Sequence, residues 1–184
     1  EAFLRERVTM RGGPGATLFG TGAWRGQTLA QVATKVGRPF EDVLIDDFGP
    51  KGASAAFFVM DEALQRRLLL DDHVMIGSDG GPTTRHPRGT GTFPRVIRRF
   101  VVAGKELSLE QAVHKMTGLT ATTVGLDRQQ RGLLQVGWTA DVLVFDPREI
   151  RDEATYEEPS RRATGMRWVI VNGVPAIADR KVTH

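Results

Sequence analysis

The chain has 184 residues and contains no cysteine, which excludes a disulfide-stabilised scaffold, a thiolate metal site and a cysteine nucleophile within it. It also lacks any apolar run near the roughly 20 residues that a membrane-spanning helix needs, and no basic-then-apolar signal segment opens it. Forty per cent of the residues are apolar and 26% are charged. This balance is typical of a soluble globular protein, so we expect a cytoplasmic protein that does not bind membranes.

Aromatic residues are also scarce, at 7% of the chain, and this bears on a basic stretch between Gly80 and Lys105. The stretch has no acidic residue and six basic ones: Arg85, Arg88, Arg95, Arg98, Arg99 and Lys105. Because stacking aromatics are not interleaved with these cations, we do not expect nucleic-acid binding. The stretch is either a solvated helix face with a loop or a binding site for an anionic substrate group.

Local patterns predict alternating strands and helices in the first 130 residues. Capping boxes begin at Thr28 and Ser108, and each is followed by an amphipathic pattern. Pro94 is expected to open a further helix. Two continuous apolar runs, Ala53–Met60 and Val74–Gly77, have the length of strands and the composition of strands buried on both faces of a parallel sheet. This alternation predicts an α/β fold.

The character of the sequence changes near Gln130, where β patterns replace helical ones. The dipeptide Asn172-Gly173, between two apolar segments, is the strongest short signal for a hairpin. We therefore predict two units, residues 1–130 and residues 131–184. One or two strand–helix units cannot close a barrel, so this organisation is typical of the end of an α/β barrel followed by a β hairpin.

Two places along the chain carry groups suited to chemistry. An apolar strand runs directly into Ser78 and Asp79, and polar residues at the carboxyl end of such strands face the ligand site of α/β folds. Alternatively, Asp79 forms an Asx-turn or a helix N-cap. The following loop contains His86 and Arg88, and a fixed guanidinium can hold a carboxylate through two hydrogen bonds. The alternative for this loop is incidental charge on a solvated surface.

The segments at these two places read MIGSDG and HPRGTGTFPR. Together they resemble the signature of N-acyl-D-amino-acid deacylases (D-aminoacylases), a family of the amidohydrolase superfamily. The resemblance runs collinearly from about Gly26 to Asp179. Its tail, ADVLVFD with a later VNG, supports only the superfamily, whereas the HPRGTGTFPR loop indicates the deacylases. The loop between Asp79 and His86 is shorter than the resemblance implies, which leaves the substrate preference open.

The resemblance implies a metal-dependent TIM barrel with a small β-sandwich. Residues 1–130 would then be the last βα units of the barrel, with Val74–Ser78 as its eighth strand, and residues 131–184 would belong to the sandwich. Asp79 would match the catalytic aspartate, which takes a proton from water and passes it to the leaving amine. Arg88 would clamp the substrate carboxylate, with His86 and Ser78 as further substrate-binding residues.

The resemblance also implies a zinc cofactor, but the four histidines form neither a His-x-His pair nor an HExxH motif. A catalytic zinc usually needs about three protein ligands, so we expect the ligands in missing N-terminal sequence or in another chain. We accordingly expect a fragment of a hydrolase of small N-acyl amino acids, inactive without the remaining N-terminal part of its barrel. Two alternatives are a cyclic-amide hydrolase related to dihydroorotases and hydantoinases, and a non-catalytic interaction domain derived from an amidohydrolase.

Overall fold

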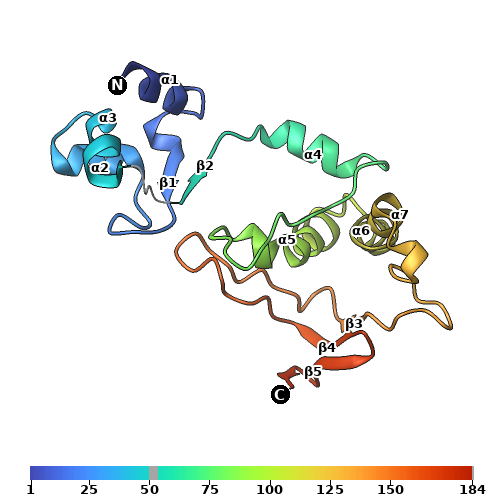
Figure 1. The fold of residues 1–184 in the computed structure, drawn as a ribbon. Helices are drawn as coiled ribbons and strands as arrows, with labels where there is room; N and C mark the ends of the chain where they lie inside the picture. The colour runs from blue at the N-terminus through green and yellow to red at the C-terminus, as the bar shows by residue number, and fades with distance from the viewer. Residues whose placement is uncertain (50–53, 184) are drawn as a thin grey trace.

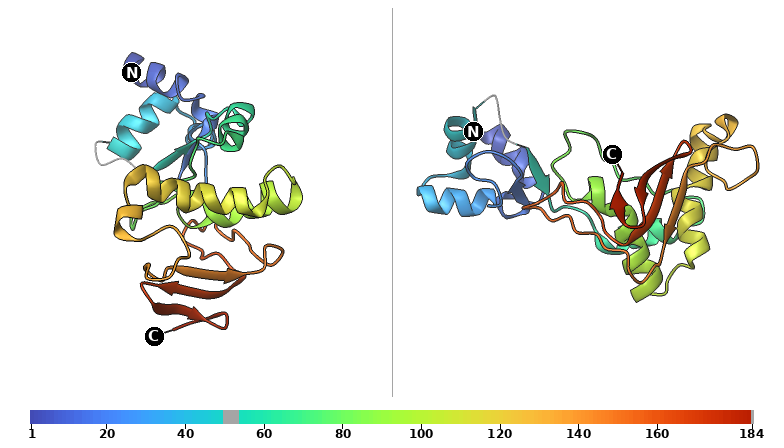
Figure 2. Two further views of the ribbon diagram at one scale, coloured as in Figure 1. Left: turned by 90° about the vertical axis from the view of Figure 1, so that its right-hand side faces the viewer. Right: turned by 90° about the horizontal axis from the view of Figure 1, so that it is seen from below.

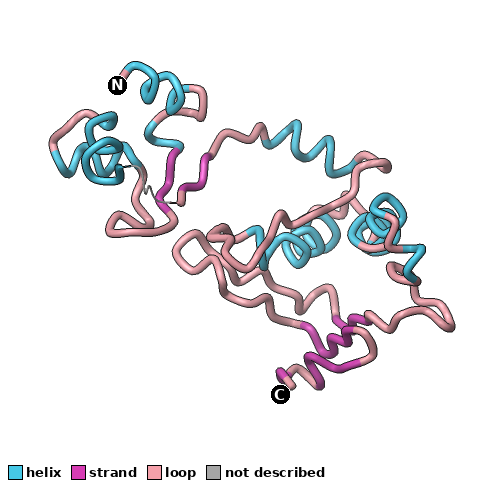
Figure 3. The backbone as a smooth tube through the Cα atoms, viewed as in Figure 1, coloured by secondary structure: helices cyan, strands magenta, loops and turns pink. Residues whose placement is uncertain are grey.

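The computed structural model describes residues 1–49 and 54–183, whose elements form three groups spread along the molecule (Figure 1). The N-terminal elements and the C-terminal sheet lie at opposite ends, with a layer of helices between them (Figure 2). Long segments without helix or strand connect the groups (Figure 3). No helix within the described ranges combines the length and apolar character that crossing a bilayer requires.

The N-terminal group contains one small core. Its elements are α1 (Ala2–Thr9), η1 (Pro14–Ala16), β1 (Thr17–Phe19), α2 (Leu29–Val36), α3 (Phe40–Asp42), η2 (Val43–Phe48) and β2 (Ala55–Phe57). The side chains of Leu29, Val32 and Val43 are fully buried in this core. The capping box predicted at Thr28 is confirmed, since the Gln31 N–H donates to Thr28 Oγ1 at 3.2 Å and the Thr28 N–H donates to Gln31 Oε1 at 2.8 Å.

The strand predicted over Ala53–Met60 is shorter and pairs differently from the prediction. Ala53 lies outside the described residues, and the strand β2 pairs antiparallel with β1 rather than within a parallel sheet. The apolar residues that follow it, Phe58, Val59 and Met60, are exposed. A run of this composition is typical of a strand covered on both faces, and the described residues do not supply that cover.

The middle group consists of helices. They are α4 (Glu62–Leu70), α5 (Arg88–Val96), η4 (Ile97–Ala103), α6 (Leu109–Met116), α7 (Gly118–Val124) and η5 (Asp127–Gln129). A second core, formed by Ile76, Val96, Leu107 and Ala112, lies among them. The prediction that Pro94 opens a helix is wrong, because α5 already begins at Arg88. Pro87 precedes that start with φ at −58°, a value that suits the first turn of a helix.

Val74–Ser78, expected as the eighth barrel strand, has no strand assignment in the structure. Its central residue Ile76 is buried, and the Ile76 N–H donates to the carbonyl oxygen of Lys115 at 3.1 Å. A strand requires a neighbouring strand for its hydrogen-bonded ladder, and among the described residues none lies beside this segment. The segment therefore lacks the partners that would make it a strand.

The C-terminal group is a four-stranded antiparallel sheet in the order β3-β4-β5-β6. Its strands are β3 (Val142–Phe145), β4 (Met166–Val171), β5 (Val174–Ala178) and β6 (Lys181–Val182). The predicted hairpin is confirmed: Asn172 and Gly173, at φ 53° and 81°, connect β4 to β5, as a type I′ turn requires. Leu143 and Val144 are neighbours that point to opposite faces, and both are exposed, so both faces of the sheet carry uncovered apolar residues.

Candidate active site

The structure brings Asp79 and Arg88 together. The Arg88 guanidinium donates through Nη2 to the Asp79 carboxylate, although the two residues come from different segments, the end of the 74–78 segment and the first turn of α5. Both side chains are accessible, at 81% exposed for Asp79 and 46% for Arg88. Asp79 therefore does not cap α5, whose N-cap position is Pro87, and its carboxylate is paired with Arg88 but accessible to a ligand.

The backbone around Asp79 is bent sharply. Asp79 has φ +48°, a left-handed conformation that non-glycine residues adopt uncommonly. Ser78 supports the bend, because its Oγ accepts a hydrogen bond from the Gly80 N–H at 3.2 Å. The sequence predicted Ser78 as a substrate-binding residue, and in the structure its hydroxyl is engaged in this turn.

Gly80 allows the bend to approach α5 closely. A Cβ added to Gly80 would lie 2.9 Å from the carbonyl oxygen of Gly89 and 3.0 Å from its Cα. Any side chain at Gly80 would therefore push the turn away from the first turn of α5. Main-chain contact therefore limits how closely the turn that carries Asp79 approaches the helix start that carries Arg88.

The imidazole of His86 is hydrogen-bonded to the backbone of Arg88. Its Nδ1 accepts a hydrogen bond from the Arg88 N–H at 3.1 Å, which satisfies one of the free donors at the start of α5. Burial is the main reason that the pKa of His86 is lowered from 6.5; Arg88 and Arg95 lower it further, while Asp79 opposes them. The lowered pKa favours the neutral ring, whose Nδ1 can accept the hydrogen bond.

Tyr156 and Phe58 extend this cluster, and sequence reasoning missed both. The ring of Tyr156 meets that of His86 edge-to-face, with centroids 5.2 Å apart, and meets that of Phe58 in the same manner at 5.0 Å. Tyr156 is the only tyrosine of the chain, and it lies within the range from about Gly26 to Asp179 over which the deacylase resemblance runs. The resemblance was the available signal for Tyr156. No rule of sequence spacing connects it with His86 or Phe58, which lie far away in the sequence.

The basic stretch divides in the structure. Arg98 pairs with Asp152, with Nε and Oδ1 2.6 Å apart, and Arg99 approaches Glu62 at 3.9 Å. These two arginines therefore connect η4 to other elements of the fold. Arg88 is the arginine of this stretch that lies beside Asp79, which makes it the candidate for binding an anionic substrate group.

The residues present do not fit a zinc site by themselves. Within residues 1–49 and 54–183 no three His, Asp or Glu side chains gather closely enough to hold a metal ion. His73 follows α4, His114 belongs to α6, and His184 lies outside the described residues. Three protein ligands are the usual requirement for a catalytic zinc, so we derive no chemical step through a metal from this set of residues.

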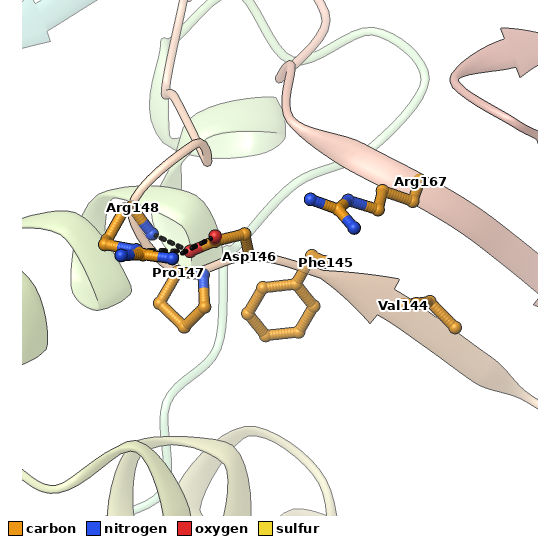
Figure 4. A pocket seen from close by; sticks show the side chains of 6 residues that line it. All are labelled: Val144, Phe145, Asp146, Pro147, Arg148 and Arg167. Carbon is orange, nitrogen blue, oxygen red and sulfur yellow. Dashed lines mark hydrogen bonds and ion pairs between the residues drawn. The ribbon is translucent and has the colours of Figure 1, made fainter.

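A surface hollow of about 530 Å³ lies on the C-terminal sheet and includes none of the predicted site residues (Figure 4). It is lined by Val144, Phe145, Asp146, Pro147, Arg148 and Arg167. The side chain and the backbone N–H of Arg148 donate to the Asp146 carboxylate, which lowers the pKa of Asp146 to about 2. Asp146 and Arg148 are thus committed to each other, and Arg167 approaches Glu149 at 3.6 Å, so the candidate site remains the cluster around Asp79.

Comparison with known proteins identifies relatives. A family model described as "Amidohydrolase family" matches residues 23–177. A D-aminoacylase of Alcaligenes xylosoxydans xylosoxydans is 44% identical over 160 residues, which are 86% of this chain and 32% of that protein. The chain therefore spans about a third of the length of this curated relative.

Solved structures give the same result at the level of the fold. A D-aminoacylase, studied for its binuclear metal centre, superimposes with a TM-score of 0.79 at 40% identity, over 91% of this chain and 35% of that one. An N-acyl-D-glutamate deacylase from Bordetella bronchiseptica, complexed with zinc and a phosphonate inhibitor, gives 0.81 at 32% identity, over 96% of this chain and 39% of that one. These matches confirm the predicted α/β class, the C-terminal part of a metal-dependent TIM barrel followed by strands of a small β-sandwich.

Proposed function

This chain belongs to the amidohydrolase family, and on that premise we propose that it is the C-terminal part of an enzyme that hydrolyses the linear amide bond of N-acyl-D-amino acids. The observation that carries the proposal is the pairing of Asp79 with Arg88. The two segments that resemble the deacylases thereby place a carboxylate and a guanidinium side by side.

The boundary between the two units of the chain follows the change of secondary structure. We propose that residues 1–130 belong to the barrel and residues 131–184 to the β-sandwich, since the last helical turn ends at Gln129 and the sheet begins at Val142. Exposed apolar side chains support the idea that further barrel elements cover this part, among them Phe58, Val59, Met60, Leu64 and Leu68. Apolar surface of this extent is rare on a protein that functions without a partner.

Amide hydrolysis needs a group that accepts a proton from the attacking water and later delivers one to the leaving nitrogen. In this proposal the Asp79 carboxylate performs both transfers. Arg88 holds the free carboxylate of the substrate through its two terminal nitrogens, as the planar guanidinium favours. Because Arg88 pairs with Asp79 in the structure, the incoming carboxylate exchanges for Asp79 and leaves that carboxylate available for chemistry.

We further propose that the enzyme depends on zinc held by residues outside this chain, and that the chain by itself is inactive. The zinc in the Bordetella bronchiseptica deacylase complex supports this assignment. The alternative of a cyclic-amide hydrolase is less favoured, because the relatives include deacylases of N-acyl-D-aspartate and N-acyl-D-glutamate, whose scissile amide bond is linear.

The test uses the complete protein that carries this chain, with N-acetyl-D-amino acids and their L enantiomers as substrates. We expect hydrolysis of the D series. Asp79→Asn should lower kcat by roughly 10²- to 10⁴-fold, the range of general acid–base catalysis, with metal content unchanged. Asp127→Asn, in η5, is the matched control and should leave kcat unaltered. Near-normal turnover of Asp79→Asn would remove this residue from the mechanism.

A further inference from the structure

We infer that Tyr156 is a positioning residue for the carboxylate clamp: its ring fixes the ring of His86, which in turn fixes the backbone of Arg88. The inference rests on the proposed function of Arg88, and it assigns to the C-terminal segment a part in the site. Three observations support it, namely how the loop carrying Tyr156 is anchored, where the Tyr156 ring lies, and what the His86 ring does.

The loop of residues 152–163 is closed at its base. Arg151 and Thr164 exchange backbone hydrogen bonds in both directions, each 3.1 Å long, and so form an isolated antiparallel bridge. From this base the loop extends past α5 toward β1 and β2, where it appears in orange (Figure 1). The loop therefore connects the C-terminal group to the elements that carry the candidate site.

The same loop is anchored to α5 and η4 along its length. Asp152, whose side chain is 10% exposed, accepts from Arg98 Nε at 2.6 Å, and Thr90 Oγ1 donates to the carbonyl oxygen of the buried Pro159 at 3.3 Å. Gly91 faces the loop where a Cβ would lie 3.4 Å from Asp152 Cβ. These contacts hold the loop at both ends of the segment that contains Tyr156.

Tyr156 is half-buried between two other aromatic rings that come from distant parts of the chain. Phe58 follows β2, and His86 precedes α5. The interplanar angles are 72° with Phe58 and 79° with His86, which is the edge-to-face arrangement that aromatic pairs favour. Tyr156 thus contacts His86 on the side of the C-terminal loop and restricts the rotation of the imidazole.

The orientation of His86 matters because only Nδ1 makes the hydrogen bond to Arg88. A ring that turns away leaves the Arg88 N–H without this acceptor, and no side chain of the N-cap residue Pro87 replaces it. The first turn of α5 then loosens, and the guanidinium at its start is held less firmly. Loss of Tyr156 should therefore weaken substrate binding through the carboxylate and leave the proton transfers of Asp79 intact.

The test compares Tyr156→Ala with Tyr156→Phe in the complete protein. The alanine variant should raise the KM for N-acyl-D-amino acids by roughly 2- to 10-fold at unchanged kcat, as expected for loss of one aromatic pair. Tyr156→Phe keeps the ring and should restore the wild-type KM. For the amides of the same N-acyl-D-amino acids, in which an amide group replaces the free carboxylate, kcat/KM should be the same in all variants. Trp168→Ala, an exposed aromatic of β4, is the control for loss of an aromatic side chain.

A double-mutant cycle shows whether Tyr156 acts through His86. If it does, Tyr156→Ala combined with His86→Ala should be no worse than His86→Ala alone, since residues in one network are not additive. An unchanged KM in Tyr156→Ala, full additivity of the two mutations, or an equal loss with amide substrates would overturn the inference. An equal rise in KM in Tyr156→Phe and Tyr156→Ala would also overturn the inference, since the hydroxyl group rather than the ring would then hold His86.

A second readout separates this inference from the proposed function. NMR titration of the His86 ring requires no activity, and Arg88, Arg95 and Asp79 act on its pKa in every variant. Tyr156→Ala should raise the pKa of His86 by reducing its burial, and Tyr156→Phe should not. If the wild-type protein has no deacylase activity, the proposed function is refuted, but the titration still shows whether Tyr156 contacts His86. An unshifted pKa in Tyr156→Ala would refute the contact.

Discussion

Replacing Arg88 with alanine removes the guanidinium that pairs with Asp79 at the start of α5. The proposed function assigns this guanidinium to the free carboxylate of the substrate, so the substitution should mainly raise KM. The proton transfers at Asp79 do not require Arg88, and kcat should therefore stay within a few-fold of the wild-type value.

The size of the effect follows from the exposure of the group. Hydrogen bonds to a charged partner contribute about 1.5–3 kcal/mol, and each 1.4 kcal/mol is about tenfold in affinity. Because the Arg88 side chain is 46% exposed, solvent screens part of this interaction and the lower half of the range applies. We expect KM to rise about 10- to 50-fold. Arg88→Lys keeps the charge but loses the planar fork, so its KM should lie between those of the wild type and Arg88→Ala.

The assay measures kcat and KM for an N-acetyl-D-amino acid and for its amide in the complete protein. Arg128→Ala, an exposed arginine of η5, serves as the matched loss of one positive charge. The Arg88 effect should vanish with the amide, which has no carboxylate to bind. An unaltered KM for the acid, or an equal rise for acid and amide, would show that Arg88 does not bind the carboxylate.

Three further expectations concern pH and metal. The pKa of His86 is lowered, so the neutral ring, which accepts the hydrogen bond, persists below pH 6.5. The KM for N-acyl-D-amino acids should therefore rise only as the pH falls through that lowered pKa. A pH profile in which KM does not rise there would contradict the role of His86. Asp146, with its pKa near 2 and an ordinary value of 3.8, contributes stability above pH 3.8 that is lost between 3.8 and about 2. Asp146→Asn should therefore lower Tm at neutral pH but not near pH 2, and a difference that persists at pH 2 would exclude the pair with Arg148 as its cause. The 184-residue chain by itself should contain no stoichiometric zinc by elemental analysis, whereas one zinc per chain would show that it supplies ligands of its own.

Features fixed by neighbouring residues could be predicted from the sequence. The capping boxes at Thr28 and Ser108 and the Asn172-Gly173 hairpin each depend on a few consecutive residues, and all three are confirmed. The predicted parallel strands are not seen in the structure, because a segment such as Val74–Ser78 becomes a strand only beside another strand, and the sequence does not show whether the described residues supply one. The prediction at Pro94 was wrong because a proline fits the start of a helix, whereas the helix that forms, α5, starts at Arg88, directly after Pro87.

The candidate site shows the same division. Asp79, His86 and Arg88 were found because they lie in two short segments whose residue types suit catalysis and carboxylate binding. Their proximity depends on the contact between Gly80 and Gly89, which spacing alone does not reveal. Tyr156 was missed, since its place beside His86 results from how the 152–163 loop is anchored on α5.

The contact between Gly80 and Gly89 has a bearing on how such an enzyme acquires new substrates. Because any side chain at Gly80 would collide with the main chain of Gly89, a substitution at Gly80 cannot bring Asp79 and Arg88 closer together in the proposed enzyme. We therefore expect selectivity among amino acids to depend on the number of residues in the connection from Gly81 to Arg85, in the loop that is shorter than the deacylase resemblance implies. Insertions and deletions in this connection, rather than substitutions at Gly80, would then alter the selectivity of the proposed enzyme.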